Sequence, residues 1–211
     1  MIPVPSILRE NSIYKESGLA TIAGLDEAGR GALAGPVVAA AVILPLDEPE
    51  RLQQLHEVND SKQLSAKTRE RLFSLITANV LCYGIGSCQA ADIDEMGIIP
   101  ATKEAMLQAL SQLDPQAGYL LIDGRIRLKR TPLPQQAVIR GDSKSLSIAA
   151  ASILAKVTRD RMMVDLDGRY PQYGFARHKG YGTEFHRQAI AQLGATPEHR
   201  LSFSPLRQTL L

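Results

Sequence analysis

The sequence predicts one α/β domain over residues 1–211, with a mixed sheet of roughly five strands flanked by helices and a basic helical extension over about residues 165–211. Apolar runs of strand length come first, and strands then alternate with segments of helical periodicity. The length suits one domain, and no repeat or Gly/Ser linker marks a second. With 45% hydrophobic and 22% charged residues, the composition excludes a disordered, collagen-like or disulfide-scaffold chain.

The first two strands are predicted to form a hairpin. Two apolar runs, residues 21–26 and 37–44, are joined by a turn rich in glycine, through Gly29, Gly31 and Gly35. Three further apolar runs of strand length lie at residues 80–87, 118–123 and 136–140.

Helical patterns separate the later strands. Ser65 can cap a helix that continues to about residue 78, with apolar residues at core spacing. The other predicted helices cover residues 101–113, the Ala-rich run 147–157, and 183–193.

The cysteines and the apolar runs indicate in which cellular compartment the protein is expected. Cys82 and Cys88 lie in one predicted strand, about 20 Å apart if it is extended, so they are expected to be reduced. The longest apolar stretch, residues 32–46, contains Pro36 and Pro45 and is too short to span a bilayer. Because the start also lacks the features of a signal peptide, we expect a cytoplasmic protein with no membrane partner.

Charge is divided unevenly along the chain, although the formal net charge is only +2. Residues 1–124 carry 9 Lys and Arg against 16 Asp and Glu, and residues 125–211 carry 15 against 6, so the two parts have net charges of −7 and +9. Such asymmetry indicates a polyanion-binding surface or a concentration of functional acids. The alternative is a solvated surface whose charges mix in the folded protein.

Four acidic residues stand where predicted elements end or begin. Asp26 and Glu27 stand at the end of the first apolar run, Asp123 ends a later one, and Asp142 precedes the Ala-rich helix. Strand ends are where α/β sheets bind ligands. A single acid there is most often a turn former or a helix cap, but three runs that each end in an acid favour a shared site.

Carboxylates that converge in one cleft repel one another unless cations neutralise them. Because the set offers only oxygen ligands, without a Cys or His cluster, it suits Mg²⁺ or Mn²⁺ rather than zinc. Two such ions about 4 Å apart are the usual device for in-line phosphodiester cleavage. We expect Asp26, on the most rigid element, to bridge them.

Three loops carry candidate phosphate contacts. The turn Gly29-Arg30-Gly31 allows close backbone approach and adds a guanidinium, although taken alone the pattern is more often a tight hairpin turn with a solvated Arg30. Lys179 and Tyr181 place a cation and a ring on a Gly-flanked loop, where a tyrosine is more often a packing anchor. Lys62 lies in a polar turn before a helix, which is its commoner explanation.

Together these motifs closely resemble one family. In chain order they are GLDEAGRG (24–31), AGPV (34–37), NDSK (59–62), LIDG (121–124), GD (141–142) leading into IAAASILAKV (148–157), and KGYGT (179–183). The chain resembles ribonuclease HII, the type 2 ribonuclease H family, from about residue 20 to residue 205. Motifs in this order and number are far more specific than any one of them.

The resemblance implies an RNase H-like fold and a metal-dependent endoribonuclease. The family hydrolyses the RNA strand of RNA–DNA hybrids and incises 5′ to single ribonucleotides in duplex DNA, as in ribonucleotide excision repair, leaving 3′-hydroxyl and 5′-phosphate ends. Asp26, Glu27, Asp123 and Asp142 resemble its four catalytic metal ligands, for two Mg²⁺ or Mn²⁺ ions.

The same resemblance implies how a ribonucleotide is read. Gly29, Arg30 and Gly31 resemble the loop that senses the 2′-hydroxyl, the group that distinguishes RNA from DNA at one nucleotide. Tyr181 resembles the ring that packs on the following sugar at an RNA–DNA junction.

Two features refine the resemblance. Family members commonly have Pro where this chain has Ala32, which could loosen the turn but removes no side chain with a role. The first acid at residue 26 and Asp142 as the fourth favour type HII over type HIII, and residues 200–205 look like the bacterial ending.

We see no motif for docking on a sliding clamp and expect a monomer. The alternative function is a non-catalytic nucleic-acid-binding module that retains the fold.

Overall fold

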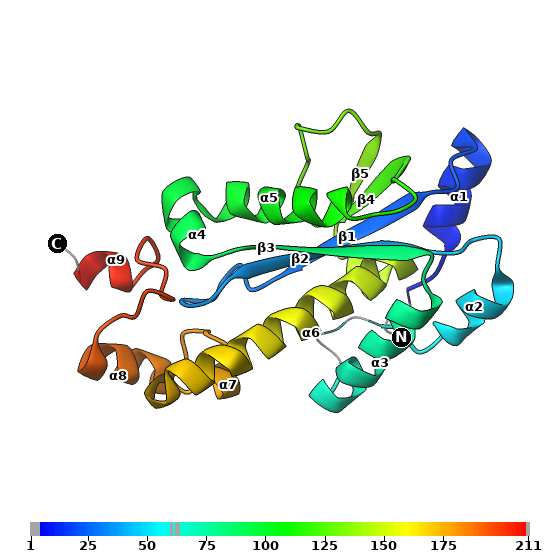
Figure 1. Ribbon diagram of the computed structural model, residues 1–211. Coiled ribbons are helices and arrows are strands. Elements are labelled where there is room, and N and C mark those ends of the chain that lie inside the picture. Colours follow the sequence, from blue (N-terminus) through cyan, green and yellow to red (C-terminus); the bar gives the residue numbers. More distant parts are fainter. Residues whose placement is uncertain (1–4, 60, 62–63, 210–211) are drawn as a thin grey trace.

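A mixed sheet of five strands lies between two layers of helices (Figure 1). The computed structural model describes residues 5–59, 61 and 64–209. In the sheet the order is β3-β2-β1-β4-β5. The strands are β1 (Ile22–Ala28), β2 (Val37–Ile43), β3 (Cys82–Cys88), β4 (Tyr119–Asp123) and β5 (Gln135–Val138).

Strand pairing confirms the predicted hairpin and the mixed sheet. β1 pairs with β2 antiparallel, and β2 with β3 antiparallel. On its other side β1 pairs with β4 in parallel, and β4 with β5 in parallel. The central strand β1 therefore joins an antiparallel half of the sheet to a parallel half.

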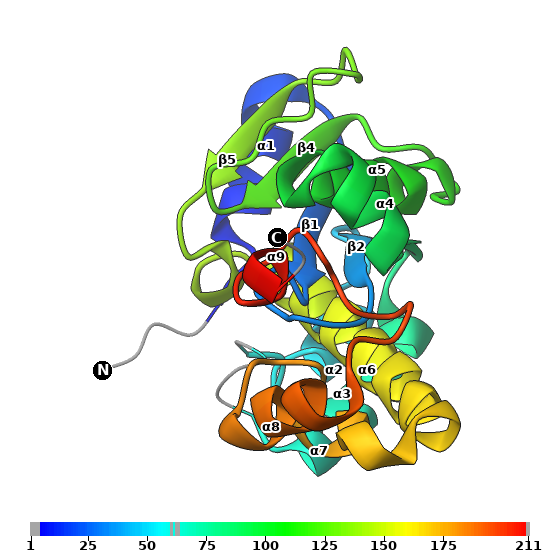
Figure 2. The same cartoon turned by 90° about the vertical axis from the view of Figure 1, so that its left-hand side faces the viewer.

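Helices cover both faces of the sheet, as Figure 2 shows in a view turned by 90°. α5 packs on β3 and β2 on one face, and α6, with α3 beside it, packs on β1 and β2 on the other. The helices are α1 (Leu8–Ser17), α2 (Pro49–Gln54), α3 (Ala66–Asn79), α4 (Ala90–Met96), α5 (Ile98–Ser111), α6 (Leu146–Arg169), α7 (Phe175–His178), α8 (Glu184–Leu193) and α9 (Leu206–Thr209), with short 3₁₀ turns η2 (Gly141–Ser143) and η3 (Pro171–Tyr173).

β2 shows why the second apolar run has no polar alternation. Val37 and Ile43 pack into the core under α5, whereas Ala40 and Val42 pack into the core under α6 and α3. All seven residues of the strand are buried. A strand buried on both faces is expected to be continuously apolar.

A buried carboxylate fixes the start of α6, the helix that leads away from Asp142. Ser145 is the N-cap, and its hydroxyl accepts a hydrogen bond from the N–H of Ile148. Oε1 of Glu10, on α1, accepts hydrogen bonds from the Ser145 hydroxyl at 2.6 Å and from the N–H and hydroxyl of Ser147. An anion at a helix N-terminus is stabilised by the free N–H groups there, so Glu10 holds α1 against α6.

Several elements differ from the sequence predictions. α1, α2 and α4 were not predicted. In α1 only Glu10 and Ile13 are buried, which is too few for a clear apolar periodicity. α6 continues to Arg169 rather than ending near residue 157, because its charged second half contains no proline and its one glycine, Gly168, comes only at the end. The first strand was predicted to stop at Asp26, but it continues to Ala28, with Asp26 opposite Ala40.

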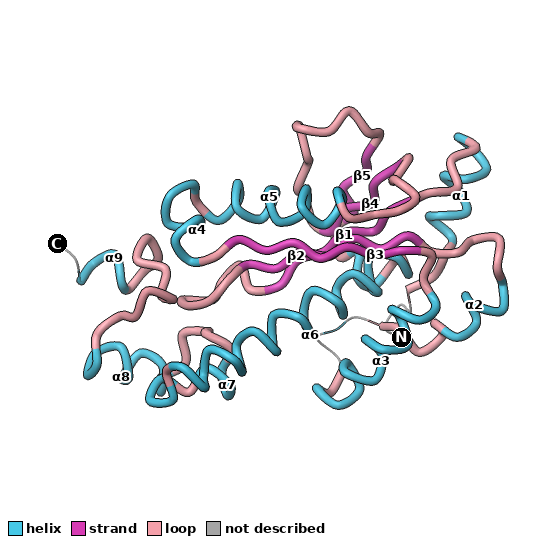
Figure 3. Tube along the Cα trace, in the orientation of Figure 1, coloured by secondary structure: helices cyan, strands magenta, loops and turns pink. Residues whose placement is uncertain are grey.

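Both cysteines are free thiols at opposite ends of β3, as predicted. Burial raises the pKa of the Cys88 thiol to about 11, so it stays protonated and unreactive near neutral pH. Within the described chain no helix is both long and apolar enough to cross a membrane. Beyond α6 the chain forms α7 and α8 and then a loop-rich segment that leads to α9 (Figure 3).

Candidate active site

A cavity of about 520 Å³ opens where β1 and β4 end. It combines carboxylates, a glycine-rich loop, a lysine and an aromatic ring. Its lining residues are Asp26, Glu27, Ala28, Gly29, Arg30, Gly31, Ser61, Ile98, Asp123, Ser152, Lys156 and Tyr181.

Strand register brings two of the predicted acids together. β1 and β4 are parallel, with Leu25 opposite Ile122, so the next residues, Asp26 and Asp123, lie on neighbouring strands at the same edge. Asp26 is only 4% exposed, and its Oδ1 accepts a hydrogen bond from the N–H of Glu27 at 2.7 Å. Asp26 therefore stands on the central strand of the sheet, where its position is rigidly fixed.

The fourth predicted acid approaches the site by a different route. Asp142 is 5% exposed in the 3₁₀ turn η2, and it is not among the residues that line the cavity. Its neighbour Gly141 donates its N–H to Oδ1 of Asp123 at 2.6 Å. Asp123 thus ties the turn that bears Asp142 to the edge of the sheet.

The donor chemistry of these acids fits a hard divalent cation, since each offers only carboxylate oxygens and Asp26 is buried. The acids are not gathered into a finished ligand set: among residues 5–59, 61 and 64–209, no group of three or more Asp, Glu, His or Cys is placed to hold a metal ion. Protein groups engage their oxygens instead. Oε1 of Glu27 accepts a hydrogen bond from Arg30 at 3.0 Å, and Oδ1 of Asp123 accepts the one from Gly141.

The Gly29-Arg30-Gly31 loop is shaped by close contacts. Gly29 has φ +92°, and a Cβ there would lie 1.9 Å from Nε of Arg159, so glycine is required. At Gly31 a Cβ would meet nothing within 4 Å, which leaves open space over the backbone on the cavity side of the loop. Arg30 is half exposed and forms an ion pair with Glu27.

Two fully buried arginines hold this loop, and the sequence motifs did not reveal them. Arg159, on α6, donates hydrogen bonds to the carbonyls of Pro36, Ala34 and Lys179. Arg200 donates to the carbonyls of Gly35 and Arg30. Burial lowers the pKa of the Arg200 guanidinium to about 9, and it lowers that of Arg159 as well.

Because these partners are carbonyls, each guanidinium donates several hydrogen bonds to the backbone of the loops. Arg159 connects the residue 34–36 segment to the carbonyl of Lys179, beside a backbone hydrogen bond from the N–H of Leu33 to the carbonyl of Gly180. Its guanidinium also lies 5.5 Å from the centroid of the Tyr181 ring, within the range of a cation–π contact. The two loops that carry the predicted substrate contacts are therefore held together by α6.

The predicted substrate-binding residues outside the glycine loop separate into three cases. Tyr181 lines the cavity and is 39% exposed, so its ring is available to a ligand. Lys179 lines a different cavity of about 260 Å³, and its Nζ donates to the carbonyl of Ala176. The structure does not bring the Lys179 side chain to the acids. Lys62 lies outside the described residues.

Sequence reasoning assigned no role to Lys156, which lines the cavity from α6. Ser152 lies one turn earlier on the same face, and its hydroxyl shares a hydrogen bond of 2.6 Å with Ser61. Nζ of Lys156 donates to Oδ1 of Asp160 at 2.6 Å. Burial lowers the pKa of Lys156, and the carboxylate of Asp160 opposes that shift. The i, i+4 spacing of Ser152 and Lys156, which places both on one face of a helix, was the feature of the sequence that could have indicated a role for Lys156.

A chain of neutral histidines supports the loop from the C-terminal side. Nδ1 of His186 donates to the carbonyl of Tyr181 at 3.0 Å, so its Nε2 accepts from Nε2 of His199 at 3.1 Å. Nδ1 of His199 in turn accepts from the N–H of Thr196. Burial lowers the pKa of both rings to about 4. The neutral pair therefore fixes the backbone of Tyr181 at neutral pH.

Comparison with known proteins places the chain in a family. Residues 23–205 match the family model "Ribonuclease HII". The chain is 54% identical over 201 residues to ribonuclease HII of Geobacillus kaustophilus, an alignment that covers 95% of this chain and 74% of that protein. It is 50% identical over 208 residues to ribonuclease HII of Chloroflexus aurantiacus, covering 99% and 97% of the two chains.

A solved structure agrees with these relatives. The crystal structure of ribonuclease H2 from Pyrococcus horikoshii OT3 superposes with a TM-score of 0.75 at 29% identity, covering 89% of this chain and 95% of that one. The sheet and its two helical layers are therefore the RNase H-like architecture that the motifs predicted. The chain belongs to the ribonuclease HII family and is thus an endoribonuclease of the ribonuclease H class.

Proposed function

We propose that the protein hydrolyses the RNA strand of RNA–DNA hybrids and incises 5′ to single ribonucleotides embedded in duplex DNA, leaving 3′-hydroxyl and 5′-phosphate ends. One observation carries the proposal beyond family membership. The cavity that holds Asp26 and Asp123 on neighbouring strands is also lined by the Gly29–Gly31 loop and by Tyr181. Groups suited to phosphodiester hydrolysis and groups suited to recognition of a sugar thus face one opening.

Asp26, Glu27, Asp123 and Asp142 would hold the divalent metal, Mg²⁺ or Mn²⁺, with two ions when substrate is bound. Such ions supply an activated water and stabilise charge on the leaving oxygen. Arg30 now forms an ion pair with Oε1 of Glu27 at 3.0 Å and would compete with a metal ion for that oxygen. Arg30 is half exposed, so a substrate phosphate can take over its guanidinium.

The glycine loop and Tyr181 would determine where the cut falls. The open space over Gly31 lets backbone groups of the loop approach the ribose closely enough to contact a 2′-hydroxyl. The half-exposed ring of Tyr181 would pack on the next sugar and so fix the register of the duplex. Lys156 adds a cation to the cavity wall, where a backbone phosphate can bind.

A nicking assay tests the proposal. Purified protein is incubated with Mg²⁺ or Mn²⁺ and a labelled DNA duplex that contains one ribonucleotide, beside an all-DNA duplex of the same sequence. We expect one cut on the 5′ side of the ribonucleotide and none in the control. Binding without cleavage across metals and pH would favour the non-catalytic module instead.

A further inference from the structure

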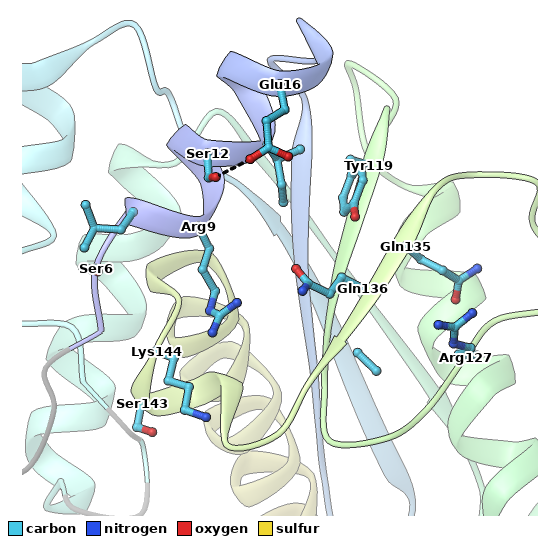
Figure 4. A pocket seen from close by; sticks show the side chains of 13 residues that line it. Ser6, Arg9, Ser12, Glu16, Tyr119, Arg127, Gln135, Gln136, Ser143 and Lys144 are labelled. Carbon is cyan, nitrogen blue, oxygen red and sulfur yellow. Dashed lines mark hydrogen bonds between the residues drawn. The ribbon is translucent and has the colours of Figure 1, made fainter.

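The largest cavity among those described, about 800 Å³, is not the one that holds the acids. It lies between α1, the strands β4 and β5, and the turn that precedes α6 (Figure 4). Three cationic side chains line it: Arg9 from α1, Arg127 from the loop between β4 and β5, and Lys144 from the turn. We refer to it as the α1–β5 pocket.

The charge of the α1–β5 pocket is not neutralised by the protein. Within the described residues, no ion pair involves Arg9, Arg127 or Lys144. Glu16 is the one carboxylate among the lining residues that the structure describes, and its Oε1 accepts a hydrogen bond from Ser12 at 2.7 Å. Nζ of Lys144 donates to the carbonyl of Ile139 at 2.8 Å, which leaves its charge in place. Three cations and one acid therefore line a single cavity, an arrangement that favours an anionic ligand.

The uncharged lining residues add donors. Gln136 is exposed on the edge strand β5, and no hydrogen bond within the described chain uses its side-chain amide. By contrast, the amide of Gln135 is occupied by both backbone groups of Leu128. Figure 4 shows Arg9, Lys144 and Gln136 projecting into the same opening, with Arg127 at its other end. Two guanidinium groups and an amide are the donors that bind phosphate oxygens well.

The α1–β5 pocket is joined to the candidate active site by two short pieces of chain. Tyr119, the first residue of β4, lines the pocket, and Asp123, the last, lines the acid cavity. Four residue steps of strand place Tyr119 about 13 Å from Asp123, while Ala137, on another wall of the pocket, pairs with Ile122. Ser143 and Lys144, which line the pocket, directly follow Asp142.

We propose that the α1–β5 pocket binds backbone phosphates of the nucleic-acid duplex at about four base pairs from the cleaved bond. This proposal rests on the proposed function, since it takes the ligand to be the same duplex. A separation of about 13 Å corresponds to roughly four base pairs at 3.4 Å each. The pocket lengthens the grip on the flanking duplex and has no part in the chemistry.

The experiment compares two double variants with equal loss of charge. R9Q/R127Q removes both pocket guanidiniums, and R71Q/R130Q removes two exposed arginines that form ion pairs with Glu57 and Glu104. Affinity for a duplex with one central ribonucleotide is measured by fluorescence anisotropy in EDTA over a range of salt concentrations. Because each phosphate contact on duplex DNA contributes about 0.9 to the slope of log K against log salt, R9Q/R127Q should lower that slope by about 1.8. R71Q/R130Q should leave it unchanged.

Flank length identifies the source of the phosphate. The same titration is repeated on duplexes truncated to three base pairs on one side of the ribonucleotide and then on the other. One truncation should abolish the difference between R9Q/R127Q and the wild type. Equal slopes for wild type and R9Q/R127Q on the long duplex, an equal fall in R71Q/R130Q, or a deficit that ignores flank length, as for a site that takes free phosphate compounds, would overturn the proposal.

The outcome of this experiment is distinct from that of the proposed function. Binding in EDTA requires no cleavage, so a wild type that fails the nicking assay could still show the predicted salt slopes. Should R9Q/R127Q fail to fold, R127Q alone, at an exposed position, is expected to lower the slope by about half as much.

Discussion

The two sides of the candidate active site are built in different ways. The acid side consists of β1 and β4, where Asp26 and Asp123 are placed by ladder hydrogen bonds and lie next to each other. The loop side consists of residues 29–36 and 179–181, which have no sheet of their own. A few backbone hydrogen bonds, such as that from the N–H of Leu33 to the carbonyl of Gly180, join its parts, and buried side chains reinforce them: Arg159, Arg200 and the His186–His199 pair.

The acids that would perform the chemistry and the loops that would recognise the substrate therefore owe their rigidity to different parts of the structure. An acid on a central strand depends on the whole sheet, so no single substitution at a distance displaces it. Loops that have few backbone hydrogen bonds of their own and are bound by two buried guanidiniums depend more strongly on single side chains. We therefore expect substitutions on the acid side to abolish activity without unfolding the protein, and substitutions behind the loops to change stability and substrate preference.

The largest effect is expected on the acid side. Asp26→Asn or Asp123→Asn removes a charged oxygen ligand while keeping the size of the side chain, so cleavage should fall by about a thousandfold or more. Affinity for the duplex in EDTA should stay within a few-fold of wild type. Single-turnover cleavage and anisotropy measure the two quantities. If either variant kept a tenth of the wild-type rate, that residue would not be a metal ligand.

The next effect concerns Arg200. Arg200→Met leaves the carbonyls of Gly35 and Arg30 without their buried donors. Each lost charged hydrogen bond costs about 1.5–3 kcal/mol, and relief of the buried charge offsets part of this, so we expect a net destabilisation of about 2 kcal/mol. Urea unfolding measures it. Arg187→Met, at an exposed arginine paired with Glu184, serves as the control and should change the free energy of unfolding by less than about 0.5 kcal/mol.

The histidine pair predicts how the loop side responds to pH. Both rings have a folded-state pKa of about 4, below the ordinary value of 6.5. Between these values the unfolded chain binds protons that the folded chain does not, so the free energy of unfolding should fall as pH falls from 6.5 towards 4. The loss is at most about 3.4 kcal/mol for each ring.

Urea titrations at several pH values test this, and two variants separate the sources. His56 is exposed, so H56Q should keep the full pH dependence. H186Q/H199Q should lose most of it over the same interval, although its stability at pH 7 will be lower. An equal slope in both variants would assign the acid sensitivity to other groups.

The smallest predicted effect tests the ring itself. Tyr181→Ala should lower cleavage at a single ribonucleotide by roughly tenfold, the equivalent of about 1.4 kcal/mol of lost stacking and packing. The metal concentration that gives half-maximal rate should not change. Tyr83→Ala, at a ring of similar exposure on β3, is the matched control. Unchanged preference for the single ribonucleotide in Tyr181→Ala would show that another group reads the junction.

The difference between the acid side and the loop side also explains which parts of the fold and of the site could be predicted from the sequence. The sheet was predictable because its apolar runs are local signals, and Asp26 and Asp123 were predictable as neighbours because they end two of those runs. Their side-by-side placement needs only the parallel pairing of β1 and β4. The N-terminal helix α1 was missed because it buries little more than Glu10 and Ile13.

The supports behind the loops could not be predicted in this way. The hydrogen bond from Arg159 to Pro36 spans 123 residues, and the one from Arg200 to Arg30 spans 170. A buried arginine also contradicts the ordinary expectation that arginine lies at the surface. Similarly, the sequence could not indicate that the side chain of Lys179, which is predicted to contact substrate, donates to the carbonyl of Ala176, or that Arg159 binds the Lys179 carbonyl.

The central claim is that the acids perform the chemistry while the loops held by Arg159 and Arg200 select the ribonucleotide. The most direct test is the single-turnover rate of wild type and Arg200→Met on two duplexes, one with a single ribonucleotide and one with a long RNA strand, at a temperature where both proteins are folded. We predict that Arg200→Met lowers the rate at the single ribonucleotide at least about tenfold more than on the long hybrid, with an unchanged metal requirement. An equal loss on both duplexes, or a shifted metal requirement, would contradict the claim.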